Sequence, residues 1–335
     1  MKIRGFDVLL ARYPRSLQPL DQPEALGGAG GLSGAQLWRY RCEAGLLVLR
    51  AWPRPGPGRA QLERIHHWLS MAVDLGFIPA PLPDRAGRTL QEHDGRFWEL
   101  APWLPGSAEP SGPPPSARLR AAFAAMAAFH QRLAGEGREG VSPGLGKRYD
   151  AVRYLLEGGL ETLEQAIRRA GGRDQADRRS AALRWLGLAR RVAPRLADPL
   201  RLAASRTVPL QPCLRDARPD HFLFEDDQVR GLVDFGAMDV DCVAGDLARL
   251  LGDWRAGNPA ARAEALAAYE AVRPLHAGES ALIAVFEAAA DLLIGEHWIR
   301  WHYVEDRRFD DPQAVSQGIA RSLARLGPLS FRVCS

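Results

Sequence analysis

Short runs of alternating apolar and polar residues near the N-terminus predict two β-hairpins. The first pairs 37–42 with 46–52 across a turn at 43–45, a spacing typical of a hairpin. The second covers 88–103, where an Asp-Gly turn at 94–95 separates two β-prone segments, and Asp-Gly is a favoured hairpin turn. We therefore expect an antiparallel β-sheet in the N-terminal part of the chain.

A helical spacing of apolar residues replaces this alternation in most of the remaining chain. Between the two hairpins, residues 60–76 place Leu62, Ile65, Leu69 and Val73 on one helical face. The other predicted helices are mostly rich in alanine and cover roughly 116–134, 148–170, 176–204, 259–272, 279–304 and 312–326.

A break in composition and one embedded β segment complete the predicted organisation. Residues 104–117 are rich in Pro, Gly and Ser, and 208–238 contains two short apolar strands joined by an acidic turn. The sequence thus predicts an α+β protein with a small antiparallel β lobe over 1–102. A large helical lobe with one embedded hairpin is expected over 103–335.

The composition is that of an ordinary globular protein. Of the 335 residues, 46% are hydrophobic and 25% are charged, which excludes a disordered chain. The 44 basic and 40 acidic residues are interspersed, which favours a solvated surface over nucleic-acid binding. The apolar stretch 281–294 is interrupted by Glu287 and Asp291, so we expect no membrane span. We expect a soluble, cytoplasmic protein without nucleic-acid or membrane partners, and the oligomeric state stays open.

Two aspartates beside the embedded hairpin carry the strongest chemical signal. Asp216 stands in a loop before the first strand, and Asp234 ends the second strand, directly before Phe235 and Gly236. This layout is typical of kinase active sites, where the first carboxylate accepts a hydroxyl proton and the second holds a metal on nucleotide phosphates. Mg²⁺ prefers such oxygen ligands.

Phosphate groups also need backbone amides and a cation. The glycine-rich run 27–34 can supply the amides, although a plain turn is the alternative. The strand that follows contains no lysine, so Arg50 is the candidate cation; the alternative is a snorkelling edge-strand residue. We expect Glu63, on the next predicted helix, to be its anionic partner.

These segments resemble the aminoglycoside phosphotransferase and choline/homoserine kinase-like superfamily, relatives of protein kinases. The resemblance is most specific at 213–251. There CLRDARPDHFLF stands in place of the family's His-Gly-Asp-x-x-x-x-Asn, and GLVDFGAMDVDCVAGDLARLL matches its Ile-Asp-Phe-Gly segment. The likeness is weaker in GGLSG, LLVLRAW, FWELAPWLPG and AFAAMAAFHQRLA, although it spans nearly the whole chain.

The resemblance implies a protein-kinase-like two-lobed fold and a site that uses ATP with one or two Mg²⁺ ions, or Mn²⁺. It implies that Asp216 is the catalytic base, that Asp234 binds metal and that Asp246 braces the catalytic loop. The nucleotide contacts implied are the amides at Gly31 and Ser33, the backbone at Ala101 and Trp103, and the Arg50–Glu63 pair.

Two departures from the family pattern bear on this site. Arg215 stands where the family has Gly, and it could support the loop or neutralise developing charge; Arg218 has an equal claim to the second role. His221 stands in place of the metal-binding Asn, and imidazole suits softer metals than Mg²⁺. Asp220 could supply the missing oxygen, the site could use one ion, or the enzyme could be impaired.

The resemblance places the acceptor site on the C-terminal helices. The segment 296–311 combines Trp298, Trp301 and Tyr303 with acidic residues, a combination that binds cations, although ordinary packing is the alternative. We therefore expect transfer of the γ-phosphoryl group of ATP to a hydroxyl of a small polar acceptor, such as an amino sugar or amino alcohol. The alternatives are a catalytically impaired, nucleotide-binding kinase-like protein and a helical interaction module.

Overall fold

The chain forms two compact units in the computed structural model, each assembled from three separate segments. The first unit comprises Met1–Gly137, Gln211–Asp239 and Asp253–Pro274, and the second comprises Arg138–Leu210, Val240–Gly252 and Leu275–Ser335. The structure describes residues 6–27, 34–108, 112–170, 176–254, 258–307, 309, 311 and 313–332.

A five-stranded antiparallel sheet, ordered β1-β2-β3-β5-β4, forms the base of the first unit. Both predicted N-terminal hairpins are confirmed, as β2–β3 and β4–β5. The turn of the second hairpin has positive φ at Asp94 (50°) and Gly95 (61°), as this tight turn requires. The strands are β1 (Glu24–Ala25), β2 (Gln36–Cys42), β3 (Gly45–Ala51), β4 (Gln91–His93) and β5 (Arg96–Pro102).

Strand alternation gives this sheet two different faces. One face buries Trp38 and Tyr40 of β2 against Leu9 and Leu10 of α1 (Phe6–Leu10), a short helix that the sequence pattern did not predict. Trp52, which follows β3, packs instead with residues that include Leu62 of α2 (Arg59–Met71). The predicted helix over 60–76 is therefore confirmed, with a 3₁₀ turn at Val73–Leu75 after α2.

The first unit also contains the embedded hairpin. This hairpin consists of β9 and β10 and forms a three-stranded antiparallel sheet with β6. The amide of Leu232 in β10 donates to the carbonyl of Phe77, which ties the hairpin to the turn after α2. The elements are β6 (Ser107–Ala108), α3 (Ser116–Arg132), β9 (Phe222–Glu225), β10 (Gln228–Leu232), α8 (Pro259–Glu270) and 3₁₀ turns at Arg15–Leu17, Ala134–Glu136 and Pro219–His221.

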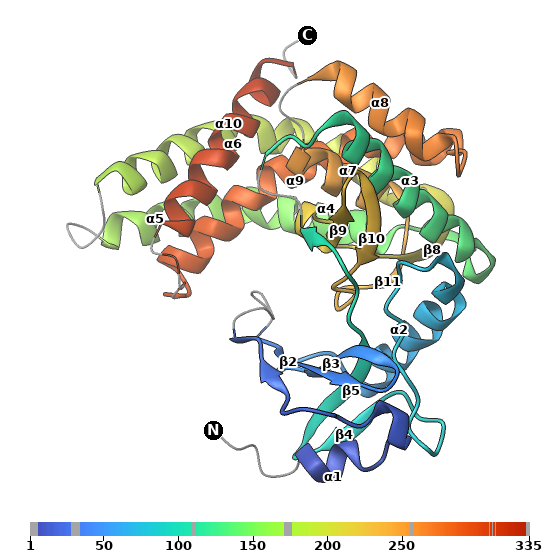
Figure 1. Cartoon of the computed structure of the whole chain (residues 1–335). Coiled ribbons are helices and arrows are strands. Elements are labelled where there is room, and N and C mark those ends of the chain that lie inside the picture. The colour runs from blue at the N-terminus through green and yellow to red at the C-terminus, as the bar shows by residue number, and fades with distance from the viewer. Residues whose placement is uncertain are drawn as a thin grey trace. The chain divides into compact units, whose positions relative to one another are not determined.

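Long helices dominate the second unit, where α6, α9 and α10 pack against one another (Figure 1). The predicted helix over 148–170 is two helices, because Gly158 adopts φ 115° and kinks the chain between α4 and α5. The helices are α4 (Pro143–Tyr154), α5 (Leu160–Ala170), α6 (Ala176–Ser205), α9 (Ala277–Tyr303) and α10 (Ala314–Arg332), with a π-type turn at Leu155–Gly159.

Three elements contain the boundaries between the units: β8 (Thr207–Cys213), β11 (Asp239–Asp241) and α7 (Ala244–Trp254), a helix absent from the predicted set. Within the second unit, β7 (Arg138–Val141) pairs antiparallel with residues 207–210 of β8. The expected division at residue 102 stays a prediction about the domains. Among the described residues, no helix combines the length and apolarity that a bilayer span requires.

Candidate active site

The cross-strand register of β3 and β5 gives Arg50 its carboxylate partner. Arg50 stands directly opposite Glu99 in this antiparallel pair, and opposite residues project on the same face of a sheet. Arg50 Nη1 lies 3.6 Å from Glu99 Oε1. The guanidinium also lies over the ring of Trp52, 5.1 Å from its centroid, within the range of a cation–π contact.

The Glu99 carboxylate is buried but fully partnered. Its Oε2 accepts from Trp52 Nε1 at 2.9 Å and hydrogen-bonds with His66 Nε2 at 2.8 Å. The other ring nitrogen of His66 hydrogen-bonds with Thr89 Oγ1 at 2.8 Å, which fixes the imidazole at both ends. Burial by itself raises the pKa of Glu99, but His66, Arg50 and Trp52 outweigh it and hold the pKa below its ordinary value.

The expected pairing of Arg50 with Glu63 is wrong in this structure. The inner face of α2 carries Leu62, Ile65 and His66, so Glu63 lies on the outer face, where it pairs with Arg59 at 3.4 Å. His66 therefore faces the sheet in the place expected for Glu63. The register within the two predicted hairpins could not have found Glu99, because the pairing of β3 with β5 joins strands of different hairpins.

In the loop that carries Asp216, Arg215 has an unusual backbone conformation and forms an ion pair with Asp239. Arg215 adopts φ 63°, a left-handed conformation that is uncommon outside glycine and concentrates at functional sites. Its Nη1 lies 3.6 Å from Asp239 Oδ2, and Asp239 Oδ1 lies 3.8 Å from Arg64 Nη2 of α2. Asp239 therefore connects the loop to α2.

Arg218 lies in the same loop and interacts electrostatically with Asp216. Its guanidinium donates two hydrogen bonds to Asp220, at 3.0 and 2.9 Å. Burial lowers the pKa of Arg218, but the charges of Asp220, Asp216 and Asp253 outweigh it and raise the pKa above its ordinary value. Arg218 thus lies in the electrostatic field of Asp216, and Arg215 forms an ion pair with Asp239.

The metal candidates His221 and Asp234 lie beside each other. His221 Nε2 is 3.6 Å from Asp234 Oδ2. Asp234 also has a left-handed φ, 64°, and its side chain is 46% exposed. A carboxylate next to an imidazole is a donor set that fits a divalent cation. Asp220 is engaged with Arg218 instead.

The two residues expected to contact adenine, Ala101 and Trp103, direct their backbone amides toward β3. The amide of Trp103 donates to the carbonyl of Leu46, so it points toward β3, and residues two apart in a strand direct their amides to the same side. Ala101 therefore also points toward β3. The Leu100 carbonyl accepts from Leu82 on the opposite edge, and the Pro102 carbonyl shares that edge.

Of three other expected residues, only Asp246 lies among the described residues. Gly31 and Ser33 lie outside the described residues. Asp246 is buried on α7 in the second unit, so its expected support of the catalytic loop, in the first unit, stays a prediction.

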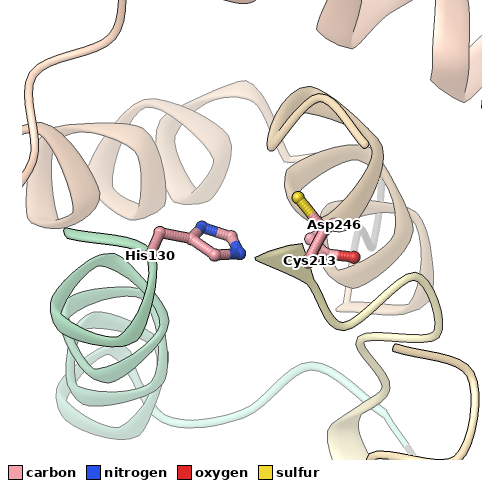
Figure 2. Close-up of side chains that lie close together, drawn as sticks. All are labelled: His130, Cys213 and Asp246. Atoms are coloured by element: carbon pink, nitrogen blue, oxygen red, sulfur yellow. The ribbon is translucent and has the colours of Figure 1, made fainter. Parts of the chain in front are cut away.

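A buried histidine and cysteine belong to the first unit. Figure 2 draws His130 at the end of α3 and Cys213 at the end of β8, together with Asp246. His130 Nδ1 hydrogen-bonds with Tyr269 at 2.8 Å, and its carbonyl accepts from Gln211, so His130 is a hydrogen-bonded residue of the core.

The aromatic segment of the second unit packs internally. The rings of Trp298 and Trp301 meet edge to face at 5.4 Å, and both contact Phe309. Arg307 lies over the Trp301 ring, 4.9 Å from its centroid. The protein's own guanidinium thus contacts the ring expected to receive a cationic acceptor, which favours the packing interpretation.

Comparison with known families gives one match. Residues 27–282 match the profile of a family described as "Phosphotransferase enzyme family", and this segment is well over half of the chain. A sequence comparison with curated proteins found no match.

Several solved structures share the fold. An amicoumacin kinase in complex with AMP-PNP, Ca²⁺ and Ami is 14% identical, with a TM-score of 0.62 over 98% of this chain and 93% of its own. The microcompartment-associated aminopropanol kinase is 17% identical, with a TM-score of 0.60 over 97% and 95%. An aminoglycoside phosphotransferase from Alicyclobacillus acidocaldarius subsp. acidocaldarius is 16% identical, with a TM-score of 0.59 over 96% and 94%. Identities this low establish the fold alone, and the expected α+β, kinase-like fold is confirmed.

Proposed function

The chain belongs to the phosphotransferase enzyme family, as its sequence resemblance predicted, and from this premise we propose that it phosphorylates a hydroxyl group of a small polar molecule with ATP. The acceptor class that we propose is an amino sugar or an amino alcohol. The solved structures with this fold include kinases of an aminopropanol and of amicoumacin, which supports a small acceptor with an amino group.

The observation that carries the proposal is the strained backbone beside both aspartates. Arg215 directly precedes Asp216, and it shares with Asp234 a left-handed φ, 63° and 64° respectively. Such a conformation costs about 1–3 kcal/mol at Arg215 and less at Asp234, because a short polar side chain tolerates it. We infer that this cost is retained because it directs the two carboxylates toward the reacting groups.

Each residue then has a defined task. Asp216 accepts the proton of the acceptor hydroxyl while the hydroxyl oxygen forms a bond to the γ-phosphorus of ATP. The bond between the γ-phosphorus and the oxygen that bridges to the β-phosphate breaks, which releases ADP. Arg50, fixed by Glu99, neutralises negative charge on the donor phosphates. Asp234 and His221 would hold a divalent cation, which supplies further charge neutralisation there when bound. The Pro102 carbonyl would accept from the adenine amino group.

The test is ADP formation with a panel of amino sugars and amino alcohols. We expect Asp216→Asn to lower kcat roughly 10²- to 10⁴-fold, because an amide accepts no proton, while affinity for AMP-PNP stays unchanged. Asp226→Asn is the matched control: it lies in the exposed turn of the same hairpin, with φ 51°, a conformation that Asn tolerates. Equal turnover by wild type and Asp216→Asn would contradict the proposed role of Asp216.

His221 supports a second candidate, a kinase-like protein that binds nucleotide without transferring phosphate. This candidate predicts AMP-PNP binding without ADP formation for any acceptor in the panel. Turnover with one acceptor excludes it.

A further inference from the structure

We propose that His221 and Asp234 form a nitrogen–oxygen cation site that binds a divalent first-row transition-metal ion in preference to Mg²⁺. The inference rests on the proposed function, because it concerns the ion that would act on the donor phosphates. The donor atoms of this chain, rather than its family, determine the class of ion.

One ion can bridge the two donor atoms. His221 Nε2 and Asp234 Oδ2 are 3.6 Å apart, which is longer than an ordinary N–H···O hydrogen bond. Two ligand atoms that each lie about 2.0–2.2 Å from the same ion are separated by roughly 3–4 Å. The pair is therefore spaced as neighbouring ligands of one ion are.

Backbone hydrogen bonds hold this arrangement. The amide of His221 donates to the carbonyl of Arg218 at 3.1 Å, and the carbonyl of His221 accepts from the amide of Val233 at 2.9 Å. Val233 directly precedes Asp234, so the second bond links the two donor residues through the main chain. The imidazole is buried and the carboxylate is half-exposed, which combines a positioned nitrogen ligand with an accessible oxygen ligand.

The chemistry of these donors disfavours Mg²⁺. Mg²⁺ takes oxygen ligands and gives up its water reluctantly, whereas imidazole nitrogen binds first-row transition metals more strongly. Asp220, the carboxylate nearest to His221 in sequence, is occupied by two hydrogen bonds from Arg218. The His221 imidazole is therefore the ligand that we place beside Asp234.

Mn²⁺ is the stringent probe, because it is the weakest binder of the transition-metal series. We expect pulsed EPR of the full chain, with Mn²⁺ and the carbon-bridged analogue AMP-PCP, to show nitrogen hyperfine coupling that is lost in His221→Asn. In calorimetric titrations we expect wild type to bind Mn²⁺ at least tenfold more tightly than Mg²⁺. His221→Asn should reduce this ratio about tenfold, because it removes the nitrogen ligand that Mn²⁺ uses better than Mg²⁺.

The control is His67→Asn, the same substitution on α2 at an imidazole that is 61% exposed, and it should retain both the coupling and the ratio. His221→Gln serves as a second variant where melting curves show that His221→Asn does not fold. Nitrogen coupling that persists in His221→Asn, or an unchanged ratio, overturns the cation site. The test separates the two proposals. Nitrogen coupling without turnover supports the cation site but contradicts the proposed function. Turnover with the same Mn²⁺-to-Mg²⁺ affinity ratio in wild type and His221→Asn supports the proposed function but contradicts the cation site.

Discussion

At the scale of single residues, the site depends on a charge that is buried together with its partners. Burial alone would raise the pKa of Glu99, but His66, Arg50 and Trp52 stabilise the ionised carboxylate. Paired burial of this kind is costly to disrupt, because removal of one partner leaves the others uncompensated. Glu99 is therefore a positioning residue for Arg50.

Substitution of Glu99 tests this arrangement through the pH dependence of stability. The pKa of Glu99 in the folded protein lies below its ordinary value of 4.5, so the ionised carboxylate stabilises the fold at pH values above 4.5. This stabilisation is lost as the pH falls through the folded pKa. We expect Glu99→Gln to lower the free energy of unfolding at pH 7 by about 2 kcal/mol. The difference between variant and wild type should shrink as pH falls below 4.5.

Denaturant unfolding from pH 7 to pH 3 measures both effects. Glu43→Gln, in the exposed turn between β2 and β3, is the matched control and should leave stability unchanged throughout. A Glu99→Gln penalty that is equal at both ends of the range would show that the ionised carboxylate adds no stability.

At the scale of elements, α2 links two parts of the site. Its inner face directs His66 to Glu99, and its Arg64 contacts Asp239, the partner of Arg215. One helix thus contacts both the residue that holds Arg50 and the loop of the expected catalytic base. Because Asp239 is 40% exposed, we attribute orientation rather than stability to this contact.

The kink between α4 and α5 depends on the conformation of one glycine. Gly158 has φ 115°, which an L side chain rarely adopts, although open space surrounds it. We expect Gly158→Ala to destabilise the protein by about 1–3 kcal/mol through backbone strain alone. The measurement is the midpoint of denaturant unfolding.

Gly187 provides a control at which the same substitution should stabilise the protein. It is exposed within α6, has open space around it and has no positive φ, so Gly187→Ala should stabilise by roughly 0.5–1 kcal/mol. Destabilisation of equal size in both variants would contradict a strain-based explanation of the kink.

At the scale of the whole molecule, ligand binding should increase stability if the proposed site forms. A nucleotide at a hundredfold excess over its Kd stabilises the folded state by about 2.7 kcal/mol. We expect AMP-PNP to raise Tm more with a divalent metal than with EDTA, and Asp234→Asn to lose the metal-dependent part. Asp226→Asn should behave as wild type. A rise in Tm that is the same in EDTA and in metal would contradict a metal role for Asp234.

Local patterns determined much of the fold without the structure. Hairpin turns, helical spacing and the Asp216 and Asp234 signals depend on residues close together in sequence, so both hairpins, α2 and the embedded hairpin were predictable. The kink at Gly158 was missed because Leu156, Leu160 and Leu163 continue a helical spacing across it, and the sequence does not reveal the φ of a glycine.

The partners of charged groups were decided by tertiary structure. Arg50 and Glu99 are distant in sequence, and strand register brings them opposite each other; the inward face of α2 then selects His66 over Glu63. Likewise, the sequence left open whether His221 or Asp220 stands beside Asp234, and the Arg218 hydrogen bonds decided it. Sequence spacing carries the type and order of the groups, whereas their contacts depend on side-chain direction, which only the packed chain fixes.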